Sequence, residues 1–526
     1  MRVHPLGVFG LLAISVSATT GCWFSMKGDA DGDSSSRAET RELPPSVVAN
    51  IEAFCSNCHA MPDPASFPRD AWPDEVLKGF GFYYASGRTD LKEPVVADVQ
   101  AYYVARAPEN YQLPGPAPID AEWRGRYRQI DVPLADAGGE TIANAAVSFI
   151  DIVDLGDPLG RGILVSDMRH GGIHFASLAP RADSPRSALV GQARLLGRVT
   201  NPAVVRVVDW DADGLKDLVV ADLGTFLPGD HDQGRVVWLR QREDAPGQFE
   251  PHDLIAGIGR VASVEIADFD GDGLQDLLVA EFGWQTTGSI FWLKRSAANH
   301  PAEGLVKKVI DSRAGTLHIP VADINGDGAP DFVALISQHH ERIEAMINDG
   351  SGNFRSELIH AAQGPTYGSS GIELVDLNGD GKWDVLATNG DAFDSFTLKP
   401  FHGVRWFENR GAFPFQPHEV GLLPGAHRAE AGDLDGDGKL EIVGASFIPR
   451  ELLNEHRKLG AEAIVVWKSM PDGGFRKHVL ATEDCIHATI KIADLDGDGR
   501  DEILAGHFRD AAGNDGPAMT IWSSQE

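Results

Sequence analysis

From about residue 121 onward, apolar runs rich in β-branched residues alternate with short acidic loops. In the first clear example the run Val204–Val208 is followed by an Asp-rich loop and then by the run Leu218–Ala221. Short apolar runs bounded by Gly and Asp are typical of buried strands. The pattern of strand, loop and strand returns at intervals of about 55 to 60 residues, the spacing of a repeat protein. We therefore expect a repeated, mainly β architecture over most of the chain.

The acidic loops share the pattern D-x-[DN]-x-D-G-x-x-[DE]. Six copies begin at Asp209, Asp268, Asp323, Asp376, Asp433 and Asp494. Glycine at position 6 permits a tight turn, and the oxygen-bearing side chains at positions 1, 3, 5 and 9 then converge on one point. Hard oxygen ligands at this density select calcium over softer metals. A single such loop is equally well explained as an acidic surface turn without a metal. In six loops in register, the clustered carboxylates would repel one another strongly unless a cation neutralised each cluster.

We expect each loop to bind one structural calcium ion through the side chains at positions 1, 3, 5 and 9 and the backbone carbonyl at position 7. An EF-hand is excluded because position 12, such as Val220, falls in an apolar run instead of being glutamate. In the last loop Asp501, beside Glu502, is expected to point outward. The six sets are Asp209, Asp211, Asp213, Leu215 and Asp217; Asp268, Asp270, Asp272, Leu274 and Asp276; Asp323, Asn325, Asp327, Ala329 and Asp331; Asp376, Asn378, Asp380, Lys382 and Asp384; Asp433, Asp435, Asp437, Lys439 and Glu441; and Asp494, Asp496, Asp498, Arg500 and Glu502.

A tryptophan follows most loops, and we interpret it as the residue that closes each unit. It occurs as Trp238, Trp292, Trp406, Trp467 and Trp522. A degenerate first copy of the unit lies at Phe149–Asp154, without the full ligand set, which gives seven units between about Ala121 and Glu526. Sheets repeated at this spacing predict a seven-bladed β-propeller, in which radial closure protects the strand edges.

The loops resemble those of FG-GAP or VCBS repeats, the calcium-bearing blades also found in integrin α-subunit propellers. This resemblance covers residues 116–526 and implies a seven-bladed propeller with calcium in the blade loops. It does not imply a reaction, because propellers host many functions.

A different motif, Cys55-Ser56-Asn57-Cys58-His59, precedes the repeats. C-x-x-C-H is the attachment signature of a covalent c-type haem, with two thioether bonds and His59 as the proximal iron ligand. The alternatives are a Cys55–Cys58 disulfide or half of a zinc site, but the chain has only 4 cysteines and no second pair to complete a zinc cluster. Residues 44–115 resemble a small class-I-like cytochrome c domain, of a kind fused to such repeats in some exported bacterial proteins.

Three helices are expected in this segment: one capped by Ser46 and running into Cys55, one at 68–79 and one at 93–106. The distal methionine usual for such cytochromes is missing, because Met61 is too close to His59 and neither Met nor His occurs between Met61 and Met168. The sixth iron position is then left to Lys78, to Lys92, to a propeller histidine such as His170, or is open. An open iron would bind small molecules, whereas a filled one suits electron transfer.

The N-terminus has the layout of an export signal, with Met1-Arg2 followed by an apolar run from Leu6 to Ala18. The ending Gly21-Cys22 resembles a lipoprotein signal, in which Cys22 is lipidated; cleavage near Ala18 would instead release a soluble exported protein. We expect residues 1–22 to be a lipoprotein-type signal peptide, 23–43 a flexible tether, 44–115 a haem domain and 116–526 the propeller. The protein is expected in the periplasm or cell envelope, attached to a membrane through its lipid anchor.

The formal charge of −31 argues against nucleic acid as a partner. We find no G-x-S-x-G elbow, zinc-protease helix or phosphate-binding glycine loop. The two longest loops, 389–404 and 447–463, are predicted recognition elements. Histidines ahead of three metal loops, His318, His427 and His487, would lie near the mouth of a central channel, either as a second metal or substrate site or as ordinary structural residues.

The leading hypothesis is an exported haem c protein that transfers electrons to a redox partner protein and uses its propeller to dock a partner or ligand. The second is an oxidoreductase whose propeller holds the substrate while haem accepts electrons. The third is an adhesion module that binds a small molecule or glycan. Acid, base and Arg residues converging in the channel would favour the second, and an exposed aromatic or acidic patch the third.

Overall fold

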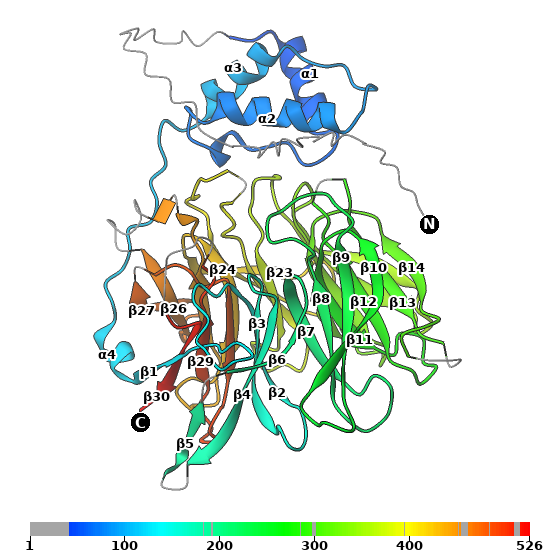
Figure 1. Ribbon diagram of the computed structural model, residues 1–526. Helices are drawn as coiled ribbons and strands as arrows, with labels where there is room; N and C mark the ends of the chain where they lie inside the picture. The colour runs from blue at the N-terminus through cyan, green and yellow to red at the C-terminus, as the bar shows by residue number, and fades with distance from the viewer. Residues whose placement is uncertain are drawn as a thin grey trace, which may run out of the picture. The chain divides into compact units, whose positions relative to one another are not determined.

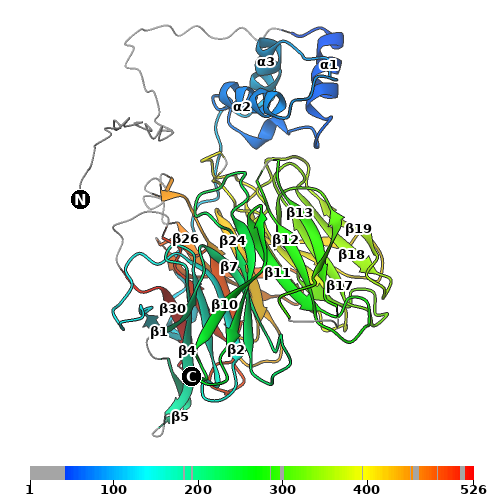
Figure 2. The same cartoon turned by 45° about the vertical axis from the view of Figure 1, so that its right-hand side comes forward.

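Seven antiparallel sheets, repeated in sequence order, form the strand-rich part of the chain in the computed structural model (Figures 1 and 2). The structure describes residues 42–181, 184–190, 193–284, 286–296, 301–393, 395–450, 452–453, 461–482, 484–509 and 516–525. The predicted signal peptide with Cys22, and the predicted tether up to residue 41, lie outside the described residues. Residues Leu43–Glu526 form one unit by their internal contacts.

Each of the first six sheets is a blade built from consecutive strands. Blade 1 holds β2 (Val147–Asp154), β3 (Arg161–Asp167), β4 (Gly172–Arg181), β5 (Ser184–Val190) and β6 (Arg194–Arg198). Blade 2 holds β7 (Pro202–Val208), β8 (Asp217–Asp222), β9 (Gly234–Gln241) and β10 (Phe249–Ile258), and blade 3 holds β11 (Val261–Ala267), β12 (Asp276–Glu281), β13 (Ser289–Lys294) and β14 (Val306–Asp311).

The second half of the propeller continues this order. Blade 4 holds β15 (Thr316–His318), β16 (Val321–Ala322), β17 (Asp331–Ile336), β18 (Arg342–Asn348) and β19 (Phe354–Ala361). Blade 5 holds β20 (Gly371–Val375), β21 (Asp384–Thr388), β22 (Gly403–Glu408) and β23 (Gln416–Leu422), and blade 6 holds β24 (Ala426–Gly432), β25 (Glu441–Ser446), β26 (Glu462–Ser469) and β27 (Phe475–Thr482).

Blade 7 joins the two ends of the repeat region. Its strands β28 (Thr489–Ala493), β29 (Glu502–Gly506) and β30 (Met519–Ser524) take β1 (Tyr127–Val132) as their fourth partner, with Ile130 opposite Ile521. The Thr520 hydroxyl also donates a hydrogen bond to Asp131 Oδ1 at 2.9 Å. The first strands of successive blades contact one another in a closed circuit, β2–β7–β11–β15–β20–β24–β28–β2. The predicted seven-bladed β-propeller is therefore confirmed.

The recurring tryptophans lie between blades. They occur on β9, β13, β22, β26 and β30, the third strands of blades 2, 3, 5, 6 and 7. In blades 2, 3, 5 and 6 a fourth strand follows, so the prediction that the tryptophans close the units is wrong there; in blade 7 the fourth strand is β1, and Trp522 does lie on the last strand in sequence order. Trp238, for example, is fully buried in a core cluster with Val264 and Leu277 of the next blade. Alternate residues of a strand face opposite sides of a sheet, so this position fills the space between neighbouring blades.

Helices occupy the segment before the repeats: α1 (Pro45–Cys55), the short 3₁₀ helix η1 (Pro64–Ser66), α2 (Trp72–Ala85), α3 (Val96–Arg106) and α4 (Ala121–Gly125). The three helices predicted for residues 44–115 are present, but each begins elsewhere, the third at Val96 instead of residue 93. Ser46 lies inside the first turn of α1, whose N-cap is Pro44 without a side-chain bond. The second helix starts at Trp72, where Pro73 occupies the first turn and Asp74 and Glu75 favour the positive end of the helix dipole.

Aromatic packing holds these helices together. Trp72 of α2 stacks on Tyr103 of α3 with ring centroids 3.8 Å apart, and Val76 and Phe80 continue the same buried face of α2. Within the described part of the chain, no helix is long and apolar enough to cross a membrane.

Candidate metal centres

The six acidic loops all connect the first strand of a blade to its second strand, so they lie at one end of the propeller. The first aspartate folds each loop. Asp268 accepts the backbone N–H groups of Gly271, Asp272 and Gly273 at 2.8 to 3.1 Å. The glycine at position 6 takes a positive φ, as at Gly214 with 90°, which a residue with a side chain adopts only with strain. The sequence pattern therefore specifies the loop conformation locally.

The position 9 carboxylates are buried beneath the loops. The set is Asp217, Asp276, Asp331, Asp384, Glu441 and Glu502, all at most 2% exposed. Asp217 accepts N–H bonds from Trp210 at 3.1 Å and Gln241 at 2.7 Å, and so connects its loop to the end of the third strand. Burial raises the pKa of Asp217 and Asp276 to about 6 and that of Glu502 to about 7. These carboxylates are costly to ionise in the fold unless a cation accompanies them.

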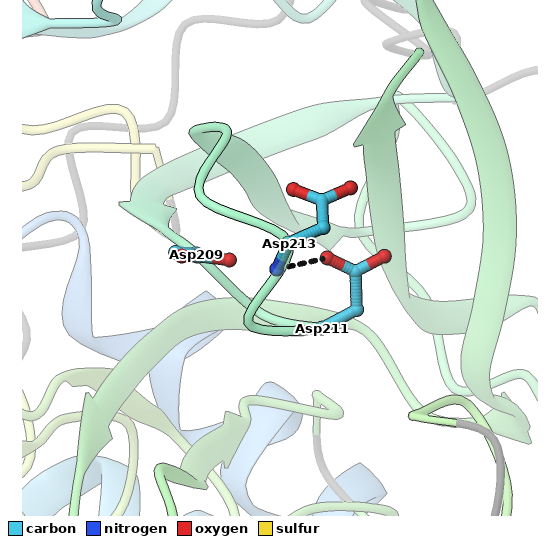
Figure 3. Close-up of side chains that lie close together, drawn as sticks. All are labelled: Asp209, Asp211 and Asp213. Carbon is cyan, nitrogen blue, oxygen red and sulfur yellow. Dashed lines mark hydrogen bonds between the residues drawn. The ribbon is translucent and has the colours of Figure 1, made fainter. Parts of the chain in front are cut away.

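Carboxylate oxygens from separate loop positions converge in four loops, with ligand atoms within 4.8 Å of one another. The groups are Asp209, Asp211 and Asp213; Asp268, Asp270 and Asp276; Asp433, Asp435 and Glu441; and Asp494, Asp496 and Glu502. Figure 3 shows the first group on a single turn, where the Asp213 N–H donates to Asp211 Oδ1 at 3.3 Å. In the first loop Asp217 is not part of the group, because both its oxygens accept backbone N–H bonds.

Several oxygens in these groups are buried without any hydrogen-bond donor. They are Asp209 Oδ1, Asp270 Oδ1, Asp276 Oδ2 and Asp435 Oδ1. Glu441 Oε1, by contrast, lies 3.0 Å from Lys468 Nζ. A buried acceptor without a partner costs free energy, and a divalent cation satisfies several such oxygens at once. The donor set therefore fits a hard cation.

The loops of blades 4 and 5 have an amide at position 3 instead of a carboxylate. Asn325 donates from Nδ2 to Asp327 Oδ2 at 2.8 Å, and Asn378 Oδ1 accepts the Asp380 N–H at 2.9 Å. Carboxylates alone form no converging group in either loop among the described residues. The predicted ligands at these two loops, and the position 7 carbonyls of all six, stay predictions.

Basic side chains lie against three of the loops at one register position of the third strand. Arg240 contacts Asp211 at 2.5 Å, Lys468 contacts Asp435 at 2.5 Å, and Lys294 forms an ion pair with Asp270. The same register position is Ile347 in blade 4, Glu408 in blade 5 and Ser523 in blade 7. Blades 2, 3 and 6 thus partly neutralise their loops from the third strand, whereas blades 4, 5 and 7 have no basic residue at that position. In blade 5 a lysine within the loop, Lys382, pairs with Asp380 at 2.7 Å.

Asp501 does not point outward as predicted. Its Oδ2 accepts the Asp433 N–H at 2.7 Å, and its own N–H donates to the Asp433 carbonyl at 2.9 Å. The reason is that residue 501 lies at the boundary with blade 6, so it joins the last two loops to each other.

A set of charged residues missed at the sequence level lines the propeller axis. The axial charge ring consists of the residue three places before the first aspartate of each loop, on the innermost strand: Asp151, Arg206, Glu265, Glu373, Glu430 and Lys491, with Pro320 in blade 4. Counting three residues back from the first aspartate of each loop in the sequence would have found this ring.

Members of the axial charge ring pair across blades. Arg206 donates to Glu265 with Nε at 2.7 Å from Oε2, and Lys491 Nζ lies 3.4 Å from Glu430 Oε2. Burial and the neighbouring Glu430 raise the pKa of Glu373 well above its usual range, so this carboxyl is favoured in its protonated form. The ring therefore connects neighbouring blades by paired charges.

The three histidines at the mouth do not form a metal site. His318 Nε2 lies 3.3 Å from the Arg428 guanidinium, a cation that opposes a metal ion there. His487 packs against His507 with ring centroids 5.1 Å apart, and no group of converging metal-ligand atoms in the described ranges contains a histidine. Burial lowers the pKa of His427 to about 4 and that of His487 to about 3, which is typical of neutral structural histidines.

The C-x-x-C-H residues lie at the C-terminal end of α1. Cys55 and Cys58 are both free thiols, so the alternative of a disulfide between them is not formed. Burial raises the pKa of Cys55 to about 11. The His59 Nδ1 lies 2.7 Å from the Ala60 carbonyl, which leaves Nε2 as the available ring nitrogen. This set fits a haem c, because a metal-bound histidine commonly donates its other ring N–H to a carbonyl.

The predicted sixth ligands already have other contacts. Lys78 pairs with Glu75 at 2.6 Å, and His170 Nδ1 lies 2.6 Å from Asp167. Met61 Sδ accepts from the Tyr103 hydroxyl at 3.7 Å, and Lys92 is exposed.

Of the two predicted recognition loops, the one between β21 and β22 is packed, since Leu398 and His402 are buried within it. The second, between Phe447 and Ala463, includes residue 451 and residues 454–460, which lie outside the described residues.

Replacing Glu502 by glutamine tests the electrostatic state of the metal centres. In the folded chain its pKa is raised from 4.5 to about 7, so ionisation between those pH values opposes folding in the absence of metal. With a chelator present, we expect Glu502→Gln to be more stable than the wild type at pH 7, by on the order of 1 to 3 kcal/mol, and equal to it at pH 4. With calcium added, the order at pH 7 should reverse. Urea unfolding at both pH values measures this, with the exposed Glu250→Gln as control; a less stable chelated variant at pH 7 would sink the interpretation.

A comparison with known protein families agrees with the repeat architecture. A family model described as FG-GAP-like repeat matches residues 209–279 and 315–387. No curated protein matches the chain. Among solved structures, the chain is similar at 11% identity to a crystal structure of BBS1N in complex with ARL6DN, soaked with lead (73% of this chain and 95% of that chain covered, TM-score 0.42). It is also similar at 11% identity to the V. cholerae biofilm matrix protein Bap1 (76% and 91% covered, TM-score 0.39). The chain thus carries FG-GAP-like repeats within a seven-bladed β-propeller.

Proposed function

We propose that the protein is an exported c-type haem protein that transfers electrons, with a propeller stabilised by calcium. The observation that carries the proposal is the arrangement at the end of α1, where two free thiols precede a histidine whose Nδ1 bonds to a carbonyl. Cys55 and Cys58 would hold the haem covalently and His59 would be its proximal ligand. The haem supplies a one-electron redox centre, and the chain supplies its attachment and surroundings.

Exposed apolar side chains near the motif support this assignment. Leu77, Phe82, Tyr84 and Val95 are each about half exposed or more, at 46 to 65%, in a segment of only a few helices. Several large apolar side chains are thus exposed within one short segment, and a macrocycle is one group that would cover such surface. The Trp72–Tyr103 stack meanwhile keeps α2 and α3 packed.

His339, in the turn after β17, is the residue we propose for the sixth iron position. Its ring centroid lies 6.4 Å from that of His59, with the two planes 17° apart. Two imidazoles on opposite sides of one metal ion have ring centres roughly 6 Å apart, since each metal–nitrogen bond is about 2 Å. Sequence reasoning missed His339 because it lies far along the chain from Cys55.

Replacing Cys55 and Cys58 by alanine should abolish covalent haem. The expected result in the exported double variant is loss of the haem stain on a denaturing gel and of the haemochrome band, with the propeller still folded by circular dichroism. The Cys485→Ala variant is the matched control, because that thiol is buried in the propeller. Retention of covalent haem in the double variant would refute the proposal.

Replacing His339 by alanine should open the iron. Wild-type protein is expected to show a low-spin spectrum that carbon monoxide does not change, whereas His339→Ala should become high-spin and bind carbon monoxide. His340→Ala, at the next position, is the control and should resemble the wild type. If the wild type carries haem but binds carbon monoxide as readily as the variant, only the assignment of His339 as the sixth ligand is rejected. If the wild type carries no haem, the proposed function is rejected.

Calcium is the cation proposed for the acidic loops, because carboxylate, amide and carbonyl oxygens are its preferred ligands. Its role is structural, since the loops connect strands and share contacts with neighbouring blades. Chelation should lower the melting temperature by several degrees, because ions that bind only the folded state stabilise it by mass action. Differential scanning calorimetry with EDTA, then excess calcium, then equal magnesium checks this. Recovery with calcium only is expected; an unchanged melting temperature contradicts the structural role.

A second function, ligand binding by the propeller, is favoured by a row of aromatic rings at the mouth opposite the metal loops. Phe226, Phe508, Phe447 and Phe393 contact one another in sequence, with centroids 4.9 to 5.8 Å apart. By contrast, we assign the axial charge ring a structural role, because Arg206 and Lys491 are paired with its own carboxylates. A docking or adhesion module therefore fits the propeller better than an oxidoreductase site on its axis.

A further inference from the structure

Among the residues that the structure describes, Arg260 is a buried cation without an ion-pair partner. It precedes β11 and is 8% exposed, and its Nε is buried without a hydrogen-bond partner. Across the described ranges, its guanidinium forms no ion pair or hydrogen bond, although its backbone carbonyl accepts N–H bonds from Phe282 and Gly283. Burial alone lowers the pKa of Arg260, to about 10, so it remains charged at neutral pH. A buried unpaired charge opposes folding, which makes this residue an anomaly.

Two polar groups on neighbouring segments, Glu281 and His231, do not pair with this charge in the described structure. Glu281, at the end of β12, accepts the Gly259 N–H at 2.6 Å and the Ser289 hydroxyl at 2.6 Å, so its two oxygens are already engaged. His231, close enough for Arg260 to lower its pKa, accepts the Gln233 N–H at Nδ1. It therefore stays neutral and donates from Nε2 to Thr225 Oγ1 at 2.7 Å.

A second guanidinium without a carboxylate partner lies nearby. Arg169 donates to the Asn144 carbonyl at 3.1 Å and to the Arg509 carbonyl, and its guanidinium carbon lies 4.5 Å above the ring of Phe226. Phe226 directly follows Thr225, the partner of His231. Arg169 thus contacts the ring of the half-buried Phe226, which also stacks on Phe508 at 5.8 Å with planes 13° apart. The bond between His231 and Thr225 connects the Phe226 segment to the surroundings of Arg260.

All these residues lie at one end of the propeller. Arg260 precedes an innermost strand, and Arg169, Phe226 and Phe508 each follow the second strand of a blade. Because the first two strands of a blade are antiparallel, the start of one and the end of the other meet at the same edge, opposite the acidic loops. Positive charge and aromatic surface are thereby gathered at the mouth of a chain whose net charge is −31.

We propose that this mouth binds a ligand that joins a carboxylate to a ring, with Arg260 pairing with the carboxylate and Phe226 and Phe508 packing on the ring. Guanidinium groups bind carboxylates through two parallel hydrogen bonds, and the interaction is strong where water is excluded. Aromatic faces bury the flat apolar side of a ring. Acidic sugars and aromatic acids share this chemistry. The site needs neither haem nor calcium as a ligand, and so extends beyond the proposed electron transfer.

Titration calorimetry of the full-length protein with benzoate, glucuronate, acetate and inorganic phosphate tests the proposal. We expect benzoate or glucuronate to bind at least tenfold more tightly than acetate and phosphate. The variant Arg260→Met should lose at least tenfold of that affinity, while Phe226→Ala should weaken the ring-bearing ligands and leave acetate unchanged. The control is Arg242→Met, whose guanidinium pairs with Asp244 on the surface and which should bind as the wild type does.

The melting temperature separates ligand binding from a structural role. Arg260→Met should melt at the same temperature as the wild type or higher, because it removes an uncompensated buried charge and keeps most of the side-chain volume. A clearly lower melting temperature would show that Arg260 supports the fold and would overturn the proposal. Equal binding of benzoate and acetate, binding by Arg260→Met at wild-type affinity, or no binding of any probe would overturn it as well.

Discussion

Mutual repulsion among buried and half-buried carboxylates at the six acidic loops is the constraint on which the rest of the propeller depends. In blades 2 to 5 the position 9 aspartate accepts a backbone N–H at the end of the third strand, and in blades 6 and 7 the position 9 glutamate accepts one from its own loop. The same group therefore specifies the blade and creates the charge that must be neutralised. In blades 2, 3 and 6 a basic residue of the third strand does part of this, and elsewhere the loops have no such residue at that position.

Neutralisation at the loops and closure of the ring are physically linked. Asp501 joins the last loop to that of blade 6, and β1 completes blade 7 from the other end of the repeat region. Along the axis, Arg206 with Glu265 and Lys491 with Glu430 pair neighbouring innermost strands. An unbalanced charge in one blade therefore also changes the electrostatic energy of the neighbouring blades. Arg260 is the exception, because its charge is not balanced within the described structure.

Local sequence pattern predicted the strand–loop–strand unit, the blade number and the loop turns, since each depends on residues within one repeat. Features that depend on neighbours in space were missed. The contact of Asp501 with Asp433 joins two blades, so the local pattern did not reveal it and Asp501 was expected to face outward. Ser46 is not the N-cap of α1, because the helix begins one residue earlier and Pro44 occupies the cap position. The axial charge ring was readable by counting back from each loop. By contrast, nothing local reveals that Arg260 lacks a partner among the described residues, because that depends on which side chains surround it in the fold.

Elemental analysis of the purified, chelator-free protein tests the central claim most directly. After exhaustive dialysis against metal-free buffer, the account predicts at least the four calcium ions that the converging carboxylate groups would hold, and no comparable content of zinc or magnesium. A folded protein that contains no calcium would contradict it, because the buried carboxylates would then be stable in the propeller without the cation.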